Sequence, residues 1–325
     1  MCIRDRLGIA MGPVGLGPLA VIGEVVDRLP FVGVESGLTD RHQAILWELR
    51  VPRVVLAGLV GGTLAMAGGS YQGVFRNPLA DPYLLGVAAG AGLGATAAIN
   101  AGAGSGDWIL PLAAFAGGLV AVAATYALGR IGGGRTTTAT LILAGVAVAS
   151  FFTSVQIFAQ QLASDRIREV YSWILGRLTT VGWSEVLVLL PFAVVSTAVL
   201  IAHGRHLDVL AVGEEEASTL GMRASRVRLT IVIAATLATA AAVSVSGLIG
   251  FVGIIVPHAV RRIAGTSYRA ILPVSLLAGG AFLILADLIA RTVIAPSEIP
   301  VGVVTAFVGA PFFALILART RRGLA

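Results

Sequence analysis

Long apolar stretches without acidic or basic residues follow one another along most of the chain. A helix needs about 20 such residues to cross a bilayer. The stretch 229–260 is too long for one span and contains Gly247 and Gly250, where we expect a turn between two helices. The pattern therefore predicts nine membrane-spanning helices, within 54–75, 82–106, 108–129, 136–164, 186–204, 229–260 (two helices), 270–286 and 299–318.

A tenth apolar stretch at 7–23 is weaker than the others. It is short, and Pro13 and Pro18 interrupt it. The preceding MCIRDR does not resemble a signal peptide, which has a basic start and an apolar middle. We therefore expect a weak or truncated first helix.

The fold class follows from the continuity of the apolar runs. Backbone groups within lipid must be hydrogen-bonded inside the protein, and a single continuous apolar run achieves this as a helix. Strands of a membrane barrel would instead alternate in polarity. The sequence therefore predicts an all-α, polytopic membrane protein in which residues 1–325 form a single transmembrane domain.

Composition supports this fold and excludes other classes. Charged residues make up 12% of the chain, apolar residues 57%, and the mean hydropathy is +0.91, whereas soluble domains carry about 25% charged residues. The net charge is +6, but the arginines lie between apolar runs, so we expect no nucleic-acid partner. The single cysteine, Cys2, excludes a disulfide framework and a thiolate metal site.

The arginine distribution favours one orientation in the membrane. With the C-terminus in the cytoplasm, thirteen arginines of the loops and helix ends lie inside and eight lie outside. This orientation places the segment 207–222 in the cytoplasm. It places 161–185 outside, where we expect a partly helical segment with Tyr171, Trp173 and Trp183 at the membrane interface.

The sequence shows no means of powering transport by itself. It contains no lysine and therefore no GxxxxGK[ST] phosphate-binding loop. Asp287 lies near the outer end of its span, and no acid lies at the middle of one, where ion-coupled carriers place ionisable groups. We predict that the chain is no enzyme, has no catalytic residue and binds no metal or cofactor. Any energy source would lie on another subunit.

Three long motifs, in order along the chain, carry a resemblance to a known family. They are QGVFRNPLADPYLLGVAAGA at 72–91, FVGIIVPHAVRR at 251–262, and ADLIAR at 286–291 followed by EIPVGVVTAFVGAPFF at 298–313. They closely resemble the signatures of FecCD/BtuC-type permeases, the membrane subunits of bacterial ABC importers for iron-siderophores, haem and cobalamin. The resemblance extends from about Gly12 to Arg322.

The resemblance implies a ten-helix, BtuC-like bundle in the bacterial cytoplasmic (inner) membrane. It implies four kinds of partner: a second copy of the chain, two cytoplasmic ATPase subunits that hold ATP and magnesium, an extracytoplasmic substrate-binding protein, and lipid. The implied substrate is a bulky metal chelate, moved by alternating access along the homodimer interface. As the substrate, we expect an iron-siderophore or haem first and cobalamin second. Two other classes of protein remain as alternatives to an ABC permease. One is a secondary transporter or channel, and the other is a polytopic membrane enzyme.

The segment 207–222, LDVLAVGEEEASTLGM, combines apolar residues with three consecutive acids. It predicts a short helix from about Val209 to Leu220, either as a solvated loop or as a docking element. The resemblance favours docking, because the matching family loop is the coupling helix that inserts into the ATPase subunit. The implied contact residues are Gly213, Glu214, Glu215, Ala217 and Leu220.

Three arginines lie on the predicted outer side. Arg50 and Arg53 share one face of a helix start, and Arg291 ends another span. They either snorkel to lipid headgroups or pair with carboxylates of a docking protein. The resemblance favours docking, because arginines at these motif positions face glutamates of the binding protein in the family.

Two further motifs are expected to be mainly structural. Prolines stop a continuous helix in the segment 76–82, and its Asn and Asp can cap helix ends. This motif contains Arg76, Asn77, Pro78, Asp81 and Pro82. The pair Pro257 and His258 is expected to pack inside the bundle, and we do not expect His258 to bind iron.

Overall fold

The computed structural model describes residues 24, 38–104, 108–131, 137–178 and 182–322, apart from the side chains of Glu214 and of residues 316–322. Within these ranges the regular elements are helices, and no strand occurs, so the predicted all-α class is confirmed. The weak first helix expected at 7–23 lies outside the described residues.

Each of the other predicted spans corresponds to one main helix, although the span 82–106 also contains the short helix η2 (Pro82–Leu85). These helices are α4 (Val51–Phe75), α5 (Val87–Asn100), α6 (Ile109–Arg130), α7 (Thr138–Leu162), α9 (Ser184–Ala202), α12 (Ala224–Ser246), α13 (Val252–Ala264), α14 (Tyr268–Thr292) and α15 (Val301–Arg322). The shorter elements are α3 (Asp40–Ala44), η1 (Ile45–Arg50), η2 (Pro82–Leu85), η3 (Ser164–Arg166), α8 (Ile167–Ile174), α10 (Gly204–Val212) and α11 (Glu214–Thr219).

Two helices are shorter than their apolar runs predict. Six helical stretches of the described chain are long and apolar enough to cross a membrane. Of the other three helices, α5 has 14 residues, α13 has 13, and α15 has described side chains only over Val301–Leu315. At 1.5 Å per residue, neither α5 nor α13 covers the roughly 30 Å of hydrocarbon. The run at 82–106 is divided because Pro82 starts the short helix η2 and Gly86, at φ 86°, separates it from α5. The run at 229–260 breaks at Gly247, as predicted.

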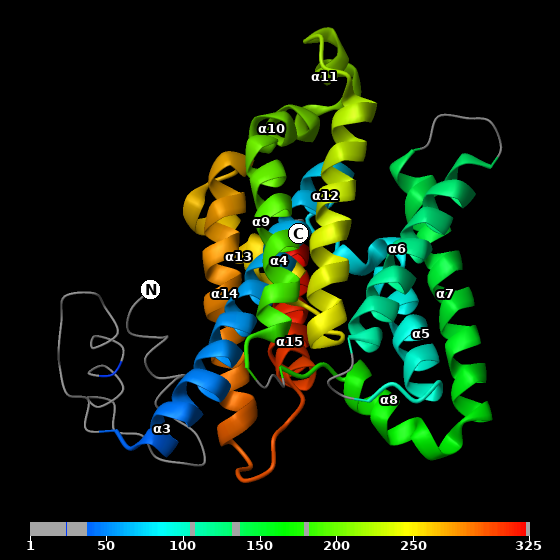
Figure 1. Ribbon diagram of the computed structural model, residues 1–325. Helices are drawn as coiled ribbons and strands as arrows, with labels where there is room; N and C mark the ends of the chain where they lie inside the picture. Colours follow the sequence, from blue (N-terminus) through cyan, green and yellow to red (C-terminus); the bar gives the residue numbers. More distant parts are fainter. Residues whose placement is uncertain (1–23, 25–37, 105–107, 132–136, 179–181, 323–325) are drawn as a thin grey trace.

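The helices pack in two groups that meet at α12. In the first group, α4 is central and contacts α9, α12, α13 and α14. In the second group, α5, α6 and α7 contact one another, and α12 also contacts α5 and α6 (Figure 1). The main hydrophobic core lies around α4, where Leu56, Leu64 and Tyr71 are fully buried.

Short helices and connections lie at both ends of the bundle. The helices α10 and α11 protrude at one end, called here the α11 end (Figure 1). The helices α3 and α8 and the connection between α14 and α15 lie at the opposite end, called here the α8 end (Figure 1). The segment 161–185 is partly helical. Trp173 is buried with Val170 on the face of α8 that packs against α5, whereas Tyr171 and Trp183 are exposed.

Glycines let α4 and α14 pack with their backbones in contact. A Cβ atom on Gly61 would overlap the carbonyl of Gly279, whereas one on Gly58 would lie 3.6 Å from Ile284, at an ordinary contact distance. We therefore expect Gly61→Ala to destabilise the protein by about 1–3 kcal/mol through overpacking. Gly58→Ala, one turn away, is the control. Thermal unfolding in detergent tests this, and equal melting temperatures would contradict the packing described.

Candidate docking and transport sites

The segment 207–222 forms two short helices rather than the single helix predicted. Helix α10 ends at Val212, Gly213 has an extended backbone with φ 167° and ψ 155°, and α11 begins at Glu214. The backbone N–H of Met222 donates to the carbonyl of Ala217 at 3.0 Å and closes the second helix. The break turns α11 away from α10, so α11 lies at the tip of the bundle (Figure 1).

The two short helices have a buried and an exposed side. Leu207, Leu210 and Ala217 are buried, whereas Val212 is 71% exposed and Leu220 is 74% exposed. Gly213 is also buried, and Glu215 is exposed, while the side chain of Glu214 lies outside the described atoms. Of the predicted contact residues, Glu215 and Leu220 are therefore available to a partner. Val212 is exposed beside them, although it was not among the predicted contact residues.

Asp208 connects α10 to the start of α14. Its carboxylate accepts hydrogen bonds from the backbone N–H of Tyr268 at 2.6 Å and from the hydroxyl of Ser267 at 2.8 Å. It therefore caps the N-terminus of α14 from a neighbouring helix, and a negative charge there also interacts favourably with the helix dipole. The sequence did not reveal this residue, because its partners are about 60 positions away.

Further polar contacts lead from Tyr268 into the bundle. Arg261 of α13 donates to the hydroxyl of Tyr268 and to the side-chain oxygen of Gln72 in α4, both at 3.2 Å. The amide of Gln72 donates to the carbonyl of Gly253 at the start of α13. The contacts thus link α10 with α14, α13 and α4 at the α11 end.

We expect Asp208→Ala to weaken the connection between α10 and the transmembrane helices. The substitution removes both capping bonds, and loss of a cap costs about 0.5–2 kcal/mol. The melting temperature of the Asp208→Ala variant should fall, while that of Asp208→Asn, which keeps an acceptor oxygen, should fall less. Thermal unfolding of the two variants in detergent checks this, and equal melting temperatures would contradict it.

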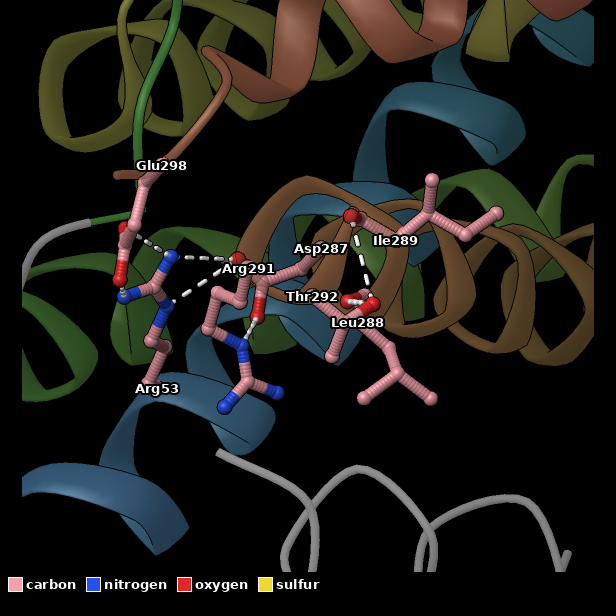
Figure 2. A network of polar contacts seen from close by, with 7 residues as sticks. All are labelled: Arg53, Asp287, Leu288, Ile289, Arg291, Thr292 and Glu298. Carbon is pink, nitrogen blue, oxygen red and sulfur yellow. Dashed lines mark hydrogen bonds and ion pairs between the residues drawn. The ribbon is translucent and has the colours of Figure 1, made fainter. Parts of the chain in front are cut away.

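A cluster of two arginines and two acids lies at the α8 end. Arg53 of α4 donates to Asp287 of α14 at 2.8 and 3.0 Å and to Glu298 at 2.8 and 3.0 Å. Arg291 reaches the other carboxylate oxygen of Asp287 at 3.0 Å (Figure 2). The carboxylate of Asp287 is 1% exposed and that of Glu298 is 42% exposed.

This cluster ties the start of α15 to α4 and α14. Glu298 lies just before α15, and the backbone N–H of Ile299 donates to the carbonyl of Ala290. Two of the three arginines that the sequence predicted as docking residues, Arg53 and Arg291, therefore already have acidic partners within the chain. Arg50 and Arg291 are each only 6% exposed. Their docking role stays a prediction. The i, i+4 spacing of Asp287 and Arg291 was visible in the sequence, whereas their pairing with Arg53 was not.

The segment 76–82 forms a tight connection between α4 and η2. Arg76 ends α4 in the left-handed conformation at φ 50°, and Asn77 accepts a bond from the backbone N–H of Leu79. Asp81 accepts from the N–H of Tyr83 at 2.7 Å and so caps η2, in which Pro82 is the first residue. Burial raises the pKa of the half-buried Asp81 to about 6, and the bond from Tyr83 opposes this shift. Pro78 lies within the same turn.

Pro257 and His258 lie in α13, where Pro257 is buried. The ring of His258 packs edge-on against Phe312 with ring centres 6.0 Å apart, and its buried Nε2 has no hydrogen-bond partner among the described atoms. In the described part of the chain, no three His, Cys, Asp or Glu side chains gather where they could hold a metal ion.

Two cavities adjoin the break between α12 and α13 at Leu248. A cavity of about 370 Å³ lies between α5, α7 and α8, and a cavity of about 560 Å³ lies against α15. Ile174 of α8 and Leu248 line both. The second is almost entirely apolar, with Phe307 78% exposed on its wall.

The sequence of this chain matches the model of the FecCD transport family over residues 7–319. The chain belongs to the FecCD family. It is 41% identical to the uncharacterised ABC transporter permease YvrB of Bacillus subtilis, over 99% of this chain and 92% of that protein. It is 45% identical to the cobalamin import permease BtuC of Halobacterium salinarum, over 87% and 76%.

Further relatives of this FecCD chain include the iron(3+)-hydroxamate permease FhuB of Bacillus subtilis, 35% identical over 90% of this chain and 81% of that protein. The fold also matches a solved metal-chelate type ABC transporter in an inward-facing conformation. The TM-score is 0.84 and the identity 26%, over 98% of this chain and 96% of that one. The chain is therefore a multi-pass ABC importer permease of the FecCD family.

Proposed function

We propose that this permease moves a bulky metal chelate into the cytoplasm by alternating access. The observation that carries the proposal is the match to the FecCD family along nearly the whole chain, with permeases for cobalamin and for iron chelates among its relatives. Iron-siderophore and haem were the first expectation from sequence. The relative at 45% identity imports cobalamin, so cobalamin is an equal first candidate.

Two copies of the chain would form the pathway between them. The apolar cavity against α15 supports this arrangement, because it is lined by Gly302, Ala306 and the exposed Phe307. A second copy on this face would cover apolar surface and enclose a passage. The passage need not bind substrate tightly, because an external binding protein would supply the affinity.

The partners would dock at opposite ends. An ATPase subunit holding ATP and magnesium would dock on each copy at the α11 end, against Val212, Glu215 and Leu220, placing 207–222 and the C-terminus in the cytoplasm. The substrate-binding protein would dock at the α8 end, with its carboxylates near Arg50, Arg53 and Arg291. Closure of the ATPase pair would move α10 and α11, and Asp208 would pass that motion to α14.

The test is an ATPase-stimulation screen of the complete complex in proteoliposomes. Haem, a ferric siderophore and cobalamin are each offered with the binding protein, and one of them should stimulate hydrolysis and accumulate inside. Stimulation by none of the three, with a folded complex, would contradict the chelate proposal. Accumulation without any ATPase subunit would favour the alternative, a secondary transporter or channel.

A further inference from the structure

The cavity between α5, α7 and α8 has one polar wall. Thr153, Gln156 and Gln160 line it from α7, and their spacing places them on one face of that helix. The remaining wall is largely small and apolar, with Ala88, Ala89 and Ala149 among its members. A mostly apolar cavity with a few convergent polar groups is typical of a small-molecule site.

The two glutamines are unusual for the helix on which they lie. Each is 7% exposed, on a helix that is otherwise mainly apolar and long enough to cross a membrane. A buried amide is unfavourable unless it is hydrogen-bonded, and polar groups inside a membrane commonly mark a substrate path. If these two side chains served packing alone, leucine at positions 156 and 160 would be as suitable as glutamine.

The neighbouring helix leaves room for the side chain of Gln156. At Gly92 of α5, a Cβ atom would lie 2.8 Å from the side-chain oxygen of Gln156. The absence of a side chain at Gly92 therefore lets the amide of Gln156 lie against the backbone of α5. Tyr83 is held at the edge of the same cavity, because its hydroxyl donates to the carbonyl of Ile249 at 3.0 Å.

We propose that Gln156 and Gln160, together with Thr153, form a substrate subsite that hydrogen-bonds the periphery of the transported chelate. Amide and hydroxyl groups are uncharged and can both donate and accept. They suit the amide, carbonyl and hydroxyl groups around a chelate rather than its metal or a carboxylate, which arginine recognises better. A volume of about 370 Å³ accommodates one edge of a bulky ligand. This inference rests on the proposed import of a chelate.

The experiment measures uptake by the complete transporter in proteoliposomes, with cobalamin and a ferric hydroxamate siderophore as probes. Thr153→Val, Gln156→Leu and Gln160→Leu remove polar atoms with little change in volume. Ser154→Ala is the matched control, because the Ser154 hydroxyl bonds its own helix at the carbonyl of Ser150 and does not line the cavity. Melting temperature and basal ATPase activity of each variant report on folding and assembly.

For the probe that the wild type imports, kcat/KM should fall about tenfold in the glutamine variants, as expected for one or two lost hydrogen bonds. Ser154→Ala should match the wild type. If the glutamine variants fail to fold, Thr153→Val carries the test with a smaller expected fall. Unchanged kcat/KM in every folded lining variant overturns the subsite alone. If the wild-type complex imports neither cobalamin nor the ferric siderophore, the proposed subsite is wrong for this ligand chemistry. If the complex does not import haem either, the proposed function is wrong as well.

Discussion

Replacing Asp287 with alanine is expected to destabilise the protein by about 3–5 kcal/mol, the loss typical of removing one partner from a buried ion pair. Its carboxylate is 1% exposed and interacts with both Arg53 and Arg291. Without it, both arginines would lose the buried carboxylate that they share, and Arg53 would keep the more exposed Glu298 as a counter-charge (Figure 2). Thermal unfolding in detergent measures the loss.

Glu298→Ala is the matched control for this prediction. Glu298 pairs with the same arginine but is 42% exposed, and exposed ion pairs contribute about 0–1 kcal/mol. Its loss should therefore lower the melting temperature little. Should the two alanine variants unfold at the same temperature, the cluster would not be organised around Asp287 as described.

Replacing Leu220 with aspartate is expected to abolish ATP-driven uptake while the protein stays folded. Leu220 is 74% exposed at the tip of the α11 end, so a charge there costs the free permease little. In a docked complex the same charge would be buried against the ATPase subunit without a partner, which is strongly unfavourable. Co-purification of the ATPase subunit and uptake in proteoliposomes measure the effect.

Ile131→Asp is the control for Leu220→Asp. Ile131 follows α6 and is 76% exposed, but it lies outside the segment 207–222. Its substitution should leave ATPase binding and uptake near wild type. Full uptake by the Leu220 variant would count against docking on this segment.

Run length and turn residues predicted most of the helices. The run 229–260 exceeded one span and contained Gly247, and the structure ends α12 one residue before it. The same reasoning overestimated the run at 82–106, because hydropathy counts apolar residues and does not register that Pro82 and Gly86 bend the backbone away from a continuous helix. The family resemblance followed from long local motifs, which the family model confirms.

The contacts of the candidate sites were harder to predict. The break at Gly213 depends on one residue that a helix tolerates at a cost of only about 1 kcal/mol, so the pattern around it still favoured one helix. The pairing of Arg53 with Asp287 joins residues 234 positions apart. Such a pairing depends on how α4 and α14 pack against each other, and no periodicity or residue spacing in the local sequence indicates it.

The most direct test of the central claim is uptake by proteoliposomes that contain this permease and its binding protein, measured with and without the ATPase subunit. We propose that the chain forms a passage powered by a separate ATPase subunit docked on 207–222. We therefore expect the chelate to accumulate only when the ATPase subunit and ATP are both present. Equal accumulation without the ATPase subunit would contradict it.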